Sequence, residues 1–468
     1  MEFRSPGQRA SDMIVTRWPS VPLAIIVFIF SSGAGILDSY LSSAQPRAPI
    51  SSSSARSPKN LILLIGDGFG PAYATLARAV AGRELVLDAY LVGSAGTAAL
   101  DSRVTDSAAA ATALACGLTT LNGAIAVDSA GVSRRTILEA AEARGMSTGL
   151  VTTSRITHAT PACFGAHHVS RNEENEIASQ MLASGVDLLL GGGSRQFHPL
   201  PAAAHQDQRD LLAEAASDGF HLVTTNTELE SAASGRLLGL FGPSHMSYVL
   251  DRDDSEPSLP AMTRVALDRL SRDPDGFFLM VEGGRIDHAG HDNDPAAAVA
   301  EVLEFDSAFN TVLDWSRRDG QTLVVVTADH ETGGLSLGTA IDGRARYEFH
   351  AEALKPVRKS AEAMASRMTD GENARKVLLE DAGIRDLNEA EATAIDLATR
   401  NDRTILIGHA ISRRAIVGWT TLGHTGVDVG VYAFGPGAIR FAGHRHLAAV
   451  GREMATALGL KIGGPINE

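Results

Sequence analysis

From Asn60 onward, one recurring pattern constrains the fold of this chain: a short apolar run ends in a glycine, carboxylate, hydroxyl or histidine, and a helical segment follows. The runs lie at residues 61–65, 149–151, 186–190, 277–281 and 323–326. Continuously apolar strands that alternate with helices predict an α/β fold with a mostly parallel central sheet and helices on both faces. Ligands bind beyond the carboxyl ends of such strands, so the polar residues at these ends should converge.

Residues 331–420 interrupt the alternation with polar helical stretches rather than buried strands. Within them, Asn388 followed by Glu391 is typical of a capping box at the start of a helix. We interpret residues 60–468 as one catalytic domain and residues 331–420 as a cap-like insertion in it near the active site.

The N-terminal segment differs in composition from the rest. Arg17 precedes an apolar run at residues 21–30, and small polar residues follow. The run is shorter than the roughly 20 residues that a membrane span needs, which favours a cleaved export signal at 1–44 over a retained anchor. A cleavage site is predicted at 42–44, Met13 is an alternative start, and residues 45–59 form a Ser/Pro-rich linker. We expect an exported protein, periplasmic or extracellular, with a membrane-anchored form as the alternative.

Composition excludes several classes of protein. The 468 residues carry a net charge of −14, which argues against nucleic-acid binding because such proteins present a basic face. Two cysteines, Cys116 and Cys163, cannot build a disulfide scaffold or a four-thiolate metal site, and we expect two buried free thiols. Any metal ion must therefore be held by histidines and carboxylates.

Two short motifs are ambiguous when taken alone. Asp67, in a glycine-rich turn after the first apolar run, resembles an ordinary turn residue. Ser107 opens an alanine-rich helix, which either Asp106 or Ser107 would cap. The same helix N-terminus would favour an alkoxide or a phosphate. No Gly-x-Ser-x-Gly elbow surrounds Ser107, so a Ser/His/Asp hydrolase is not supported.

Three histidines are candidate metal ligands. Asp287 and His291 are four residues apart, so on a helix they share one face and suit Zn²⁺. The adjacent pair Asp329 and His330 ends the strongest apolar run. His424, alone before another apolar run, is usually a structural histidine, and only the presence of the others favours a ligand.

Taken together, the motifs closely resemble the alkaline phosphatase family. They occur in family order and cover about residues 60–460, and the matching stretches are 66–70, 105–108, 157–161, 166–171, 190–193, 245–251, 256–259, 281–291, 327–334 and 419–426.

The resemblance implies hydrolysis of phosphomonoesters by two Zn²⁺ ions and one Mg²⁺ through a phosphoserine at Ser107, with Arg171 clamping the phosphate. It implies a homodimer acting on small phosphomonoester substrates. It assigns one zinc to Asp287, His291 and His424, the second to Asp67, Asp329 and His330, and the magnesium to Asp67, Thr160 and Glu282. It also places His158, Asn172 and His288 in the magnesium shell or the phosphate pocket.

Two positions depart from one branch of the family. His158 and His288 stand where the enterobacterial members carry Asp and Lys, which leaves the magnesium affinity open but not the reaction. A phosphodiesterase or a phosphoglycerate mutase of the same superfamily shares the two-metal core, but Arg171 and the Thr160/Glu282 site favour a monoesterase. A sulfatase would need a modifiable residue in a Cys/Ser-x-Pro-x-Arg setting, and Ser107 lacks it. An inactive binding protein on this scaffold should have lost ligands, and none is missing.

Overall fold

The computed structural model describes residues 57–198, 209–232, 235–341 and 343–466. The export signal predicted at 1–44, and the predicted linker up to residue 56, lie outside the described residues. Within the described ranges, no helix is both long and apolar enough to cross a bilayer.

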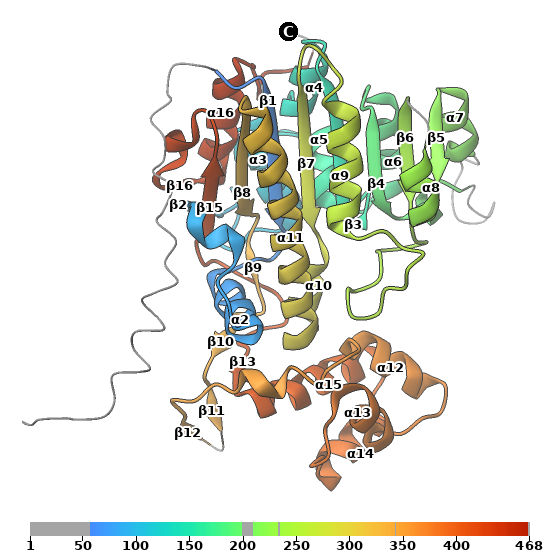
Figure 1. Cartoon of the computed structure of the whole chain (residues 1–468), viewed down its shortest axis with the longest axis vertical. Helices are drawn as coiled ribbons and strands as arrows, with labels where there is room; N and C mark the ends of the chain where they lie inside the picture. Colours follow the sequence, from blue (N-terminus) through green and yellow to red (C-terminus); the bar gives the residue numbers. More distant parts are fainter. Residues whose placement is uncertain (1–56, 199–208, 233–234, 342, 467–468) are drawn as a thin grey trace, which may run out of the picture. The chain divides into compact units, whose positions relative to one another are not determined.

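A ten-stranded sheet forms the centre of the fold, in the order β16-β2-β15-β8-β1-β7-β3-β4-β6-β5 (Figure 1). Only β15 runs against its neighbours β2 and β8; the other pairings are parallel, which confirms the mostly parallel sheet. Its strands are β1 (Asn60–Gly66), β2 (Leu91–Gly96), β3 (Ser147–Arg155), β4 (Leu188–Gly192), β5 (Phe220–Val223), β6 (Arg236–Leu240), β7 (Phe277–Gly283), β8 (Thr322–Ala328), β15 (Val429–Phe434) and β16 (Gly443–His446).

The register of the central strands explains why distant residues meet. Gly66 at the end of β1 is level with Gly283 of β7 and with Ala328 of β8. Every residue of these three strands is buried, since helices cover both faces. The polar residues that follow them therefore emerge side by side at one edge of the sheet.

Helices α9 (Leu259–Leu270) and α11 (Pro295–Asp319) pack together on one face of the sheet, and α3 (Ser107–Cys116), α5 (Ala159–Gly165) and α16 (Leu447–Leu458) pack on the other. All ten residues of α3 are buried, because its alanines let other helices approach closely. At Gly451 of α16, an added Cβ would lie 2.4 Å from the Leu114 carbonyl oxygen of α3. Cys116 and Cys163 are buried free thiols, as predicted.

Outside the region 331–420, the other described helices are α2 (Pro71–Ala81), α4 (Ile137–Glu142), α6 (Glu174–Ala183), α7 (Leu211–Ser217), α8 (Asn226–Ser231) and α10 (Arg285–His291). The 3-10 turns of the described residues are η1 (Val86–Tyr90), η2 (Ser194–Gln196), η3 (Ala351–Ala353) and η4 (Ala438–Phe441).

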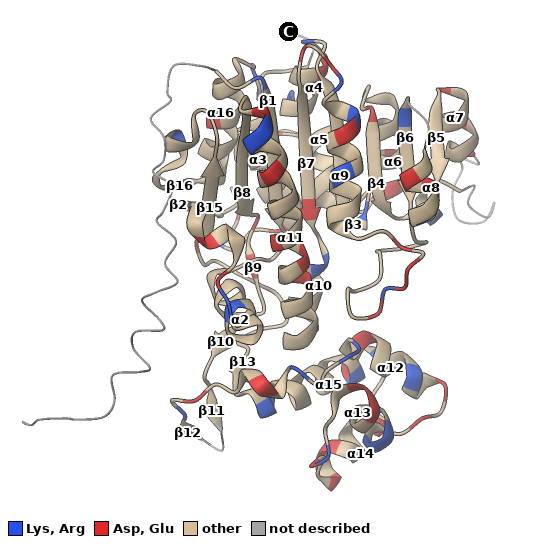
Figure 2. Cartoon of the chain, viewed as in Figure 1, with Lys and Arg blue, Asp and Glu red and all other residues tan. Residues whose placement is uncertain are grey.

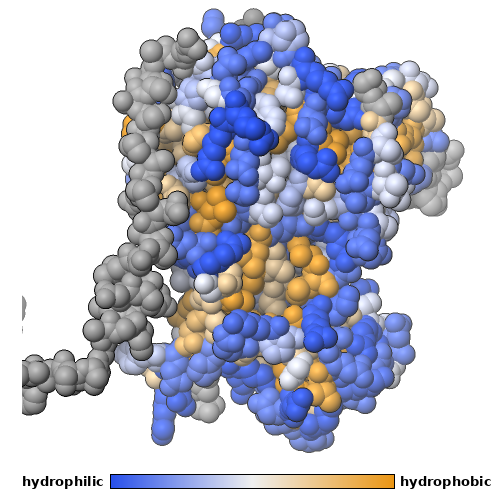
Figure 3. Space-filling view, viewed as in Figure 1, coloured by the Kyte–Doolittle hydropathy of each residue, from blue (hydrophilic) through white to orange (hydrophobic). Residues whose placement is uncertain are grey.

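The region 331–420 contains the predicted polar helices α12 (Ala361–Thr369), α13 (Ala374–Ala382), α14 (Glu389–Leu397) and α15 (Arg400–Ala415). Asn388 and Glu391 form the predicted capping box of α14. Basic and acidic residues intermingle over these helices (Figure 2), and their visible surface is largely hydrophilic (Figure 3).

The expectation that this region lacks buried strands is wrong. It also contains β9 (Glu331–Thr332), β10 (Ser336–Leu337), β11 (Ala340–Ile341), β12 (Arg344–Ala345) and β13 (Val417–Gly418), and the residues of β9 and β13 are buried. β9 pairs with β14 (His424–Thr425), so a two-residue pairing returns His424 to the end of the sheet.

Candidate metal centre and phosphate pocket

Carboxylates and imidazoles from five segments of the chain meet at the carboxyl edge of the sheet. Asp67 follows β1, Glu282 lies near the end of β7, and Asp329 and His330 follow β8. Asp287 and His291 lie on α10 one turn apart, as their spacing predicted. His424 arrives from β14.

The first group surrounds Ser107 at the start of α3. The Oγ of Ser107 lies 3.2 Å from Nε2 of His330. That nitrogen is also 3.2 Å from a carboxylate oxygen of Asp329 and 3.5 Å from one of Asp67. Oxygen and nitrogen donors at this spacing fit one Zn²⁺ beside the serine oxygen.

The second group lies next to the first. Nε2 of His291 is 3.3 Å from Oδ2 of Asp287, and Nε2 of His424 is 3.6 Å from Oδ1 of the same carboxylate. The rings of His330 and His424 stack with their centroids 3.6 Å apart. Asp287, His330 and His424 also have ligand atoms within 4.8 Å of one another. His330 therefore lies between the two groups and is close enough to belong to either.

The other nitrogen of each of these imidazoles has a fixed partner. Nδ1 of His291 faces the carbonyl oxygen of Leu422, and Nδ1 of His424 lies 2.9 Å from that of Thr105. A carbonyl only accepts, so both rings donate from Nδ1 and leave the Nε2 lone pair to the centre. His330 is held in the same way by the Thr332 hydroxyl, 3.2 Å from its Nδ1.

A third group lies on the other side of Asp67. Ligand atoms of Asp67, His158 and Glu282 lie within 4.8 Å of one another. The Thr152 hydroxyl donates to Oε2 of Glu282 at 2.5 Å, which fixes the carboxylate. The three oxygen donors Asp67, Glu282 and Thr160 are all buried, and such hard donors suit Mg²⁺, whereas the His158 imidazole suits Zn²⁺ better.

Buried atoms without a partner test whether these groups fit metal ions. Among the described residues, both carboxylate oxygens of Asp67, Oε1 of Glu282 and Oδ2 of Asp329 are buried without a hydrogen bond, as are Nδ1 of His158 and Oγ1 of Thr160. Leaving such atoms unpaired costs roughly 1–3 kcal/mol each, and more for charged groups. A cluster of unpaired acceptors is what a cation site requires, so the residues fit the metals.

The pKa values show the same need for positive charge. Burial raises the pKa of Asp67 well above its usual range, and neighbouring carboxylates raise it further. Burial also raises the pKa of Glu282 to about 7. Burial opposes the ionised form of Asp287 too, but the imidazoles beside it hold its pKa well below the ordinary value.

Two partners hold the side chain of Arg171, the residue expected to bind phosphate. Its Nη1 donates to Oδ2 of Asp106 at 3.0 Å, and its Nη2 lies 3.0 Å from Nε2 of His158. Asp106, not Ser107, is the N-cap of α3, because its side chain accepts from the Ala109 N–H. Arg171 and Ser107 are therefore connected through one carboxylate.

His288 and Asn172, both expected in the magnesium shell or the phosphate pocket, have different surroundings. The His288 ring lies 5.9 Å from that of His158, centroid to centroid, and its Nδ1 is 3.0 Å from the carbonyl oxygen of Gly284. Asn172 is exposed, and among the described residues only its backbone N–H has a partner, the Ser170 hydroxyl.

Three residues of the site escaped the sequence analysis. The His245 ring lies 4.1 Å from that of His288 and 5.6 Å from that of His158, centroid to centroid. Thr332 donates to Asp287 and contacts His330. Asp106 was considered only as a helix cap. A lone histidine in a loop and a threonine after a strand carry no signal of their own; their position in matched motifs was the only available sign.

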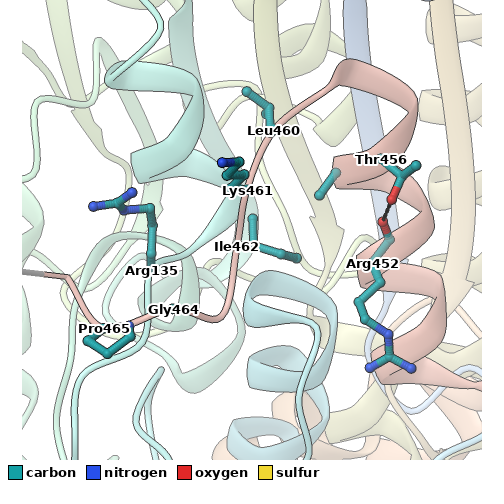
Figure 4. A pocket seen from close by; sticks show the side chains of 9 residues that line it. Arg135, Arg452, Thr456, Leu460, Lys461, Ile462, Gly464 and Pro465 are labelled. Carbon is teal, nitrogen blue, oxygen red and sulfur yellow. Dashed lines mark hydrogen bonds between the residues drawn. The ribbon is translucent and has the colours of Figure 1, made fainter. Parts of the chain in front are cut away.

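The pocket in Figure 4 lies elsewhere, along α16 and the chain that follows it. It measures about 500 Å³ and is lined by Arg135, Arg452 and Lys461 among others, and by none of the candidate metal ligands.

Comparison with known proteins agrees with the geometry. The family model described as alkaline phosphatase matches residues 58–460. Alkaline phosphatase 3 of Bacillus subtilis is 40% identical over 421 residues, covering 86% of this chain and 89% of the relative.

Among solved structures, the cold-active alkaline phosphatase from Shewanella sp. is 36% identical with a TM-score of 0.79, over 85% of this chain and 99% of that one. A histidine-to-aspartate variant of TAB5 alkaline phosphatase, with Mg bound in its M3 site, is 29% identical with a TM-score of 0.66, over 86% of this chain and 99% of that one. The chain is therefore an enzyme of the alkaline phosphatase family.

Proposed function

We propose that this enzyme hydrolyses phosphomonoesters through a covalent phosphoserine on Ser107, with two zinc ions and one magnesium ion. One observation carries the proposal: the Ser107 hydroxyl lies at the N-terminus of α3, 3.2 Å from His330 and among buried carboxylates without partners. A serine is a weak nucleophile until a base or a metal activates it. His330 is not placed as the base of a Ser/His/Asp triad, because Asp329 contacts the same Nε2 that faces Ser107 and Thr332 faces Nδ1.

The donor sets assign the ions. Asp287, His291 and His424 would hold one zinc, and Asp67, Asp329 and His330 the other. Asp67, Thr160 and Glu282 would hold magnesium, and the TAB5 variant with Mg in its M3 site supports a magnesium site in this fold. When bound, the ions supply the positive charge that stabilises the serine alkoxide, the leaving-group oxygen and the phosphate.

The chain's own residues perform the transfer. Oγ of Ser107 forms a bond to phosphorus as the ester P–O bond breaks and the alcohol leaves. Water then attacks the phosphoserine, the Ser107 oxygen departs, and inorganic phosphate is released. Arg171 binds two phosphate oxygens with its planar fork, and Asp106 and His158 hold that fork in place.

Charge makes the pocket attractive to a dianion. Four buried carboxylates with three divalent cations leave a net charge of about +2, and Arg171 with its partner Asp106 leaves that total unchanged. The whole protein carries −14. Phosphoryl transfer depends on positioning and charge neutralisation more than on acid–base catalysis.

The direct test compares 4-nitrophenyl phosphate with bis(4-nitrophenyl) phosphate, with and without a chelator. We expect the monoester to be hydrolysed far faster, and the activity to disappear with EDTA and return with Zn²⁺ and Mg²⁺. Preference for the bis-ester would indicate a phosphodiesterase instead, and activity that survives thorough metal removal would refute the two-metal site.

We also propose that the protein is exported and forms a homodimer in which the region 331–420 takes part. The basic flank and short apolar run before residue 44 support export, and the 94-residue separation of His330 and His424 leaves room for a contact element. N-terminal sequencing of secreted protein tests the first. Light scattering tests the second, and a monomer at micromolar concentration would refute it.

A further inference from the structure

A pocket of about 590 Å³ lies beside the phosphate pocket, between the loop joining β6 to α9 and the helices α12 and α15. Figure 1 shows that loop reaching down toward α12. His245 belongs to both places: it lines the pocket, and its ring is 4.1 Å from that of His288 and 5.6 Å from that of His158. His158 in turn contacts Arg171, so only the side chains of His245 and His158 separate this pocket from the proposed phosphate-binding arginine.

Most of the acidic groups in the lining already have partners. Asp251 accepts hydrogen bonds from the backbone and the hydroxyl of Ser360. Glu362 accepts from Arg285 at 2.7 Å. Asp381 accepts from Arg367 at 2.6 Å. Asp370 is the remaining carboxylate, and it is exposed.

The basic groups are less completely paired. Arg285 is 95% buried and stacks over the Tyr248 ring with its central carbon 3.7 Å from the ring centre. Its Nε is nevertheless buried without a hydrogen-bond partner. The side chains of Lys359 and Arg400, on the pocket wall, have no hydrogen-bond or ion-pair partner among the described residues, although the charge of Lys359 favours the ionised form of Asp251.

These groups favour an anion of a particular charge. The lining holds four cationic and four acidic side chains, so it is neutral overall. A neutral pocket with a few unpaired donors suits a singly charged carboxylate better than a second phosphate dianion, which would need excess positive charge. Its volume is in the usual range for small-molecule sites.

We propose that this pocket binds a carboxylate on the alcohol part of the substrate, so that the enzyme prefers phosphomonoesters whose alcohol carries a carboxylate several atoms from the ester oxygen. The proposal rests on the phosphomonoesterase activity proposed above and specifies its substrate class. Arg285 supplies the buried donor, and Lys359 and Arg400 supply charge at the wall.

The test uses the metal-loaded enzyme and two linear substrates that differ in one group. 6-Phosphogluconate carries a carboxylate where sorbitol 6-phosphate carries a hydroxymethyl group. We expect wild-type kcat/KM to favour 6-phosphogluconate by about fivefold or more, and Lys359→Glu to lower that ratio by about fivefold. Arg358→Glu is the matched control: it makes the same charge change one residue away on an exposed side chain outside the lining, and it should leave the ratio unchanged.

Each outcome decides the proposal. Equal kcat/KM for the two substrates in wild type, or an equal fall in the ratio for the Lys359 variant and the Arg358 control, would overturn it. If Lys359→Glu does not fold, Arg400→Glu provides the same comparison. Hydrolysis of 4-nitrophenyl phosphate in parallel separates the two claims: if it proceeds without a carboxylate preference, only the pocket assignment fails, and if it is absent the phosphomonoesterase proposal fails.

Discussion

Asp106 joins Arg171, the proposed phosphate-binding residue, to the helix that begins at Ser107, the proposed nucleophile, which makes Asp106→Asn an informative substitution. Oδ1 of Asp106 accepts from the N–H of Ala109 at 2.9 Å. Oδ2 accepts from the N–H of Gly123 and from Arg171, both at 3.0 Å. Asparagine can still cap the helix through its carbonyl oxygen, but it removes the charge that holds Arg171.

The expected change in phosphate affinity follows from the conformational freedom that the Arg171 side chain loses on binding phosphate. With its partner weakened, the guanidinium is ordered by phosphate rather than in advance, at a cost of about 0.5–1.5 kcal/mol. Because 1.4 kcal/mol corresponds to a factor of ten, the inhibition constant for inorganic phosphate should rise by about 2- to 12-fold. The unfolding free energy should fall by roughly 1–3 kcal/mol, because the amide nitrogen that replaces Oδ2 cannot accept from the Gly123 N–H. Asp106→Ala loses the helix cap as well and should cost about 1 kcal/mol more.

The assay is competitive inhibition by inorganic phosphate, with zinc and magnesium content measured on the same samples. Asp210→Asn is a matched control, because Asp210 caps α7 through the Ala213 N–H in the same way and is remote from the site in sequence. An unchanged or lower inhibition constant for Asp106→Asn, with full metal content, would refute the view that this carboxylate pre-orders Arg171.

Three further substitutions test other parts of the site and the fold. Ser107→Ala should keep its zinc but take up no label from radiolabelled phosphate after acid quenching. Asp329→Ala, by contrast, should lose zinc on dialysis. In the wild-type enzyme, label on a residue other than Ser107 would exclude Ser107 as the nucleophile. His158→Asp should lower the Mg²⁺ concentration for half-maximal activity, because a carboxylate adds a hard, charged donor, and an equal or higher concentration would exclude His158 from that site. Burial alone would lower the pKa of His167, but its 2.8 Å contact with Glu139 raises the pKa above the ordinary value. The pair therefore stabilises the folded state fully below the unfolded pKa of about 6.5. This stabilisation is lost as the pH rises through the folded pKa of His167. His167→Gln should therefore cost about 1.5–3 kcal/mol of unfolding free energy near pH 5 and less near pH 9 by denaturant titration, and a cost that grows with pH would contradict this assignment.

The main features of the sheet could be predicted from local sequence. Buried parallel strands must be apolar on both faces, so the continuously apolar runs at 61–65, 277–281 and 323–326 are recognisable as central strands from the sequence. The spacing of Asp287 and His291 required one helical face, and α10 supplies it. The order of the motifs along the chain is enough to identify the family from the sequence.

The sequence could not show which residues fix the site in place. Nδ1 of His424 is held by the carbonyl oxygen of Thr105, 319 residues away, and no spacing rule connects the two. Thr332 and His245 look unremarkable in sequence because their roles arise only from neighbours brought by other segments.

The sequence by itself determined the apolar strands of the central sheet, the presence of polar helices in 331–420 and the chemical types of the candidate metal ligands, because apolar periodicity and residue chemistry are local properties. The tertiary structure alone decided which imidazole nitrogen faces the candidate metal centre, that Asp106 connects Arg171 to the first turn of α3, and that a pocket with unpaired donors lies near His158 and His288. The physical reason is that hydrogen bonds and burial depend on the distances between segments, and the pairing of β1 with β7 and β8 sets those distances.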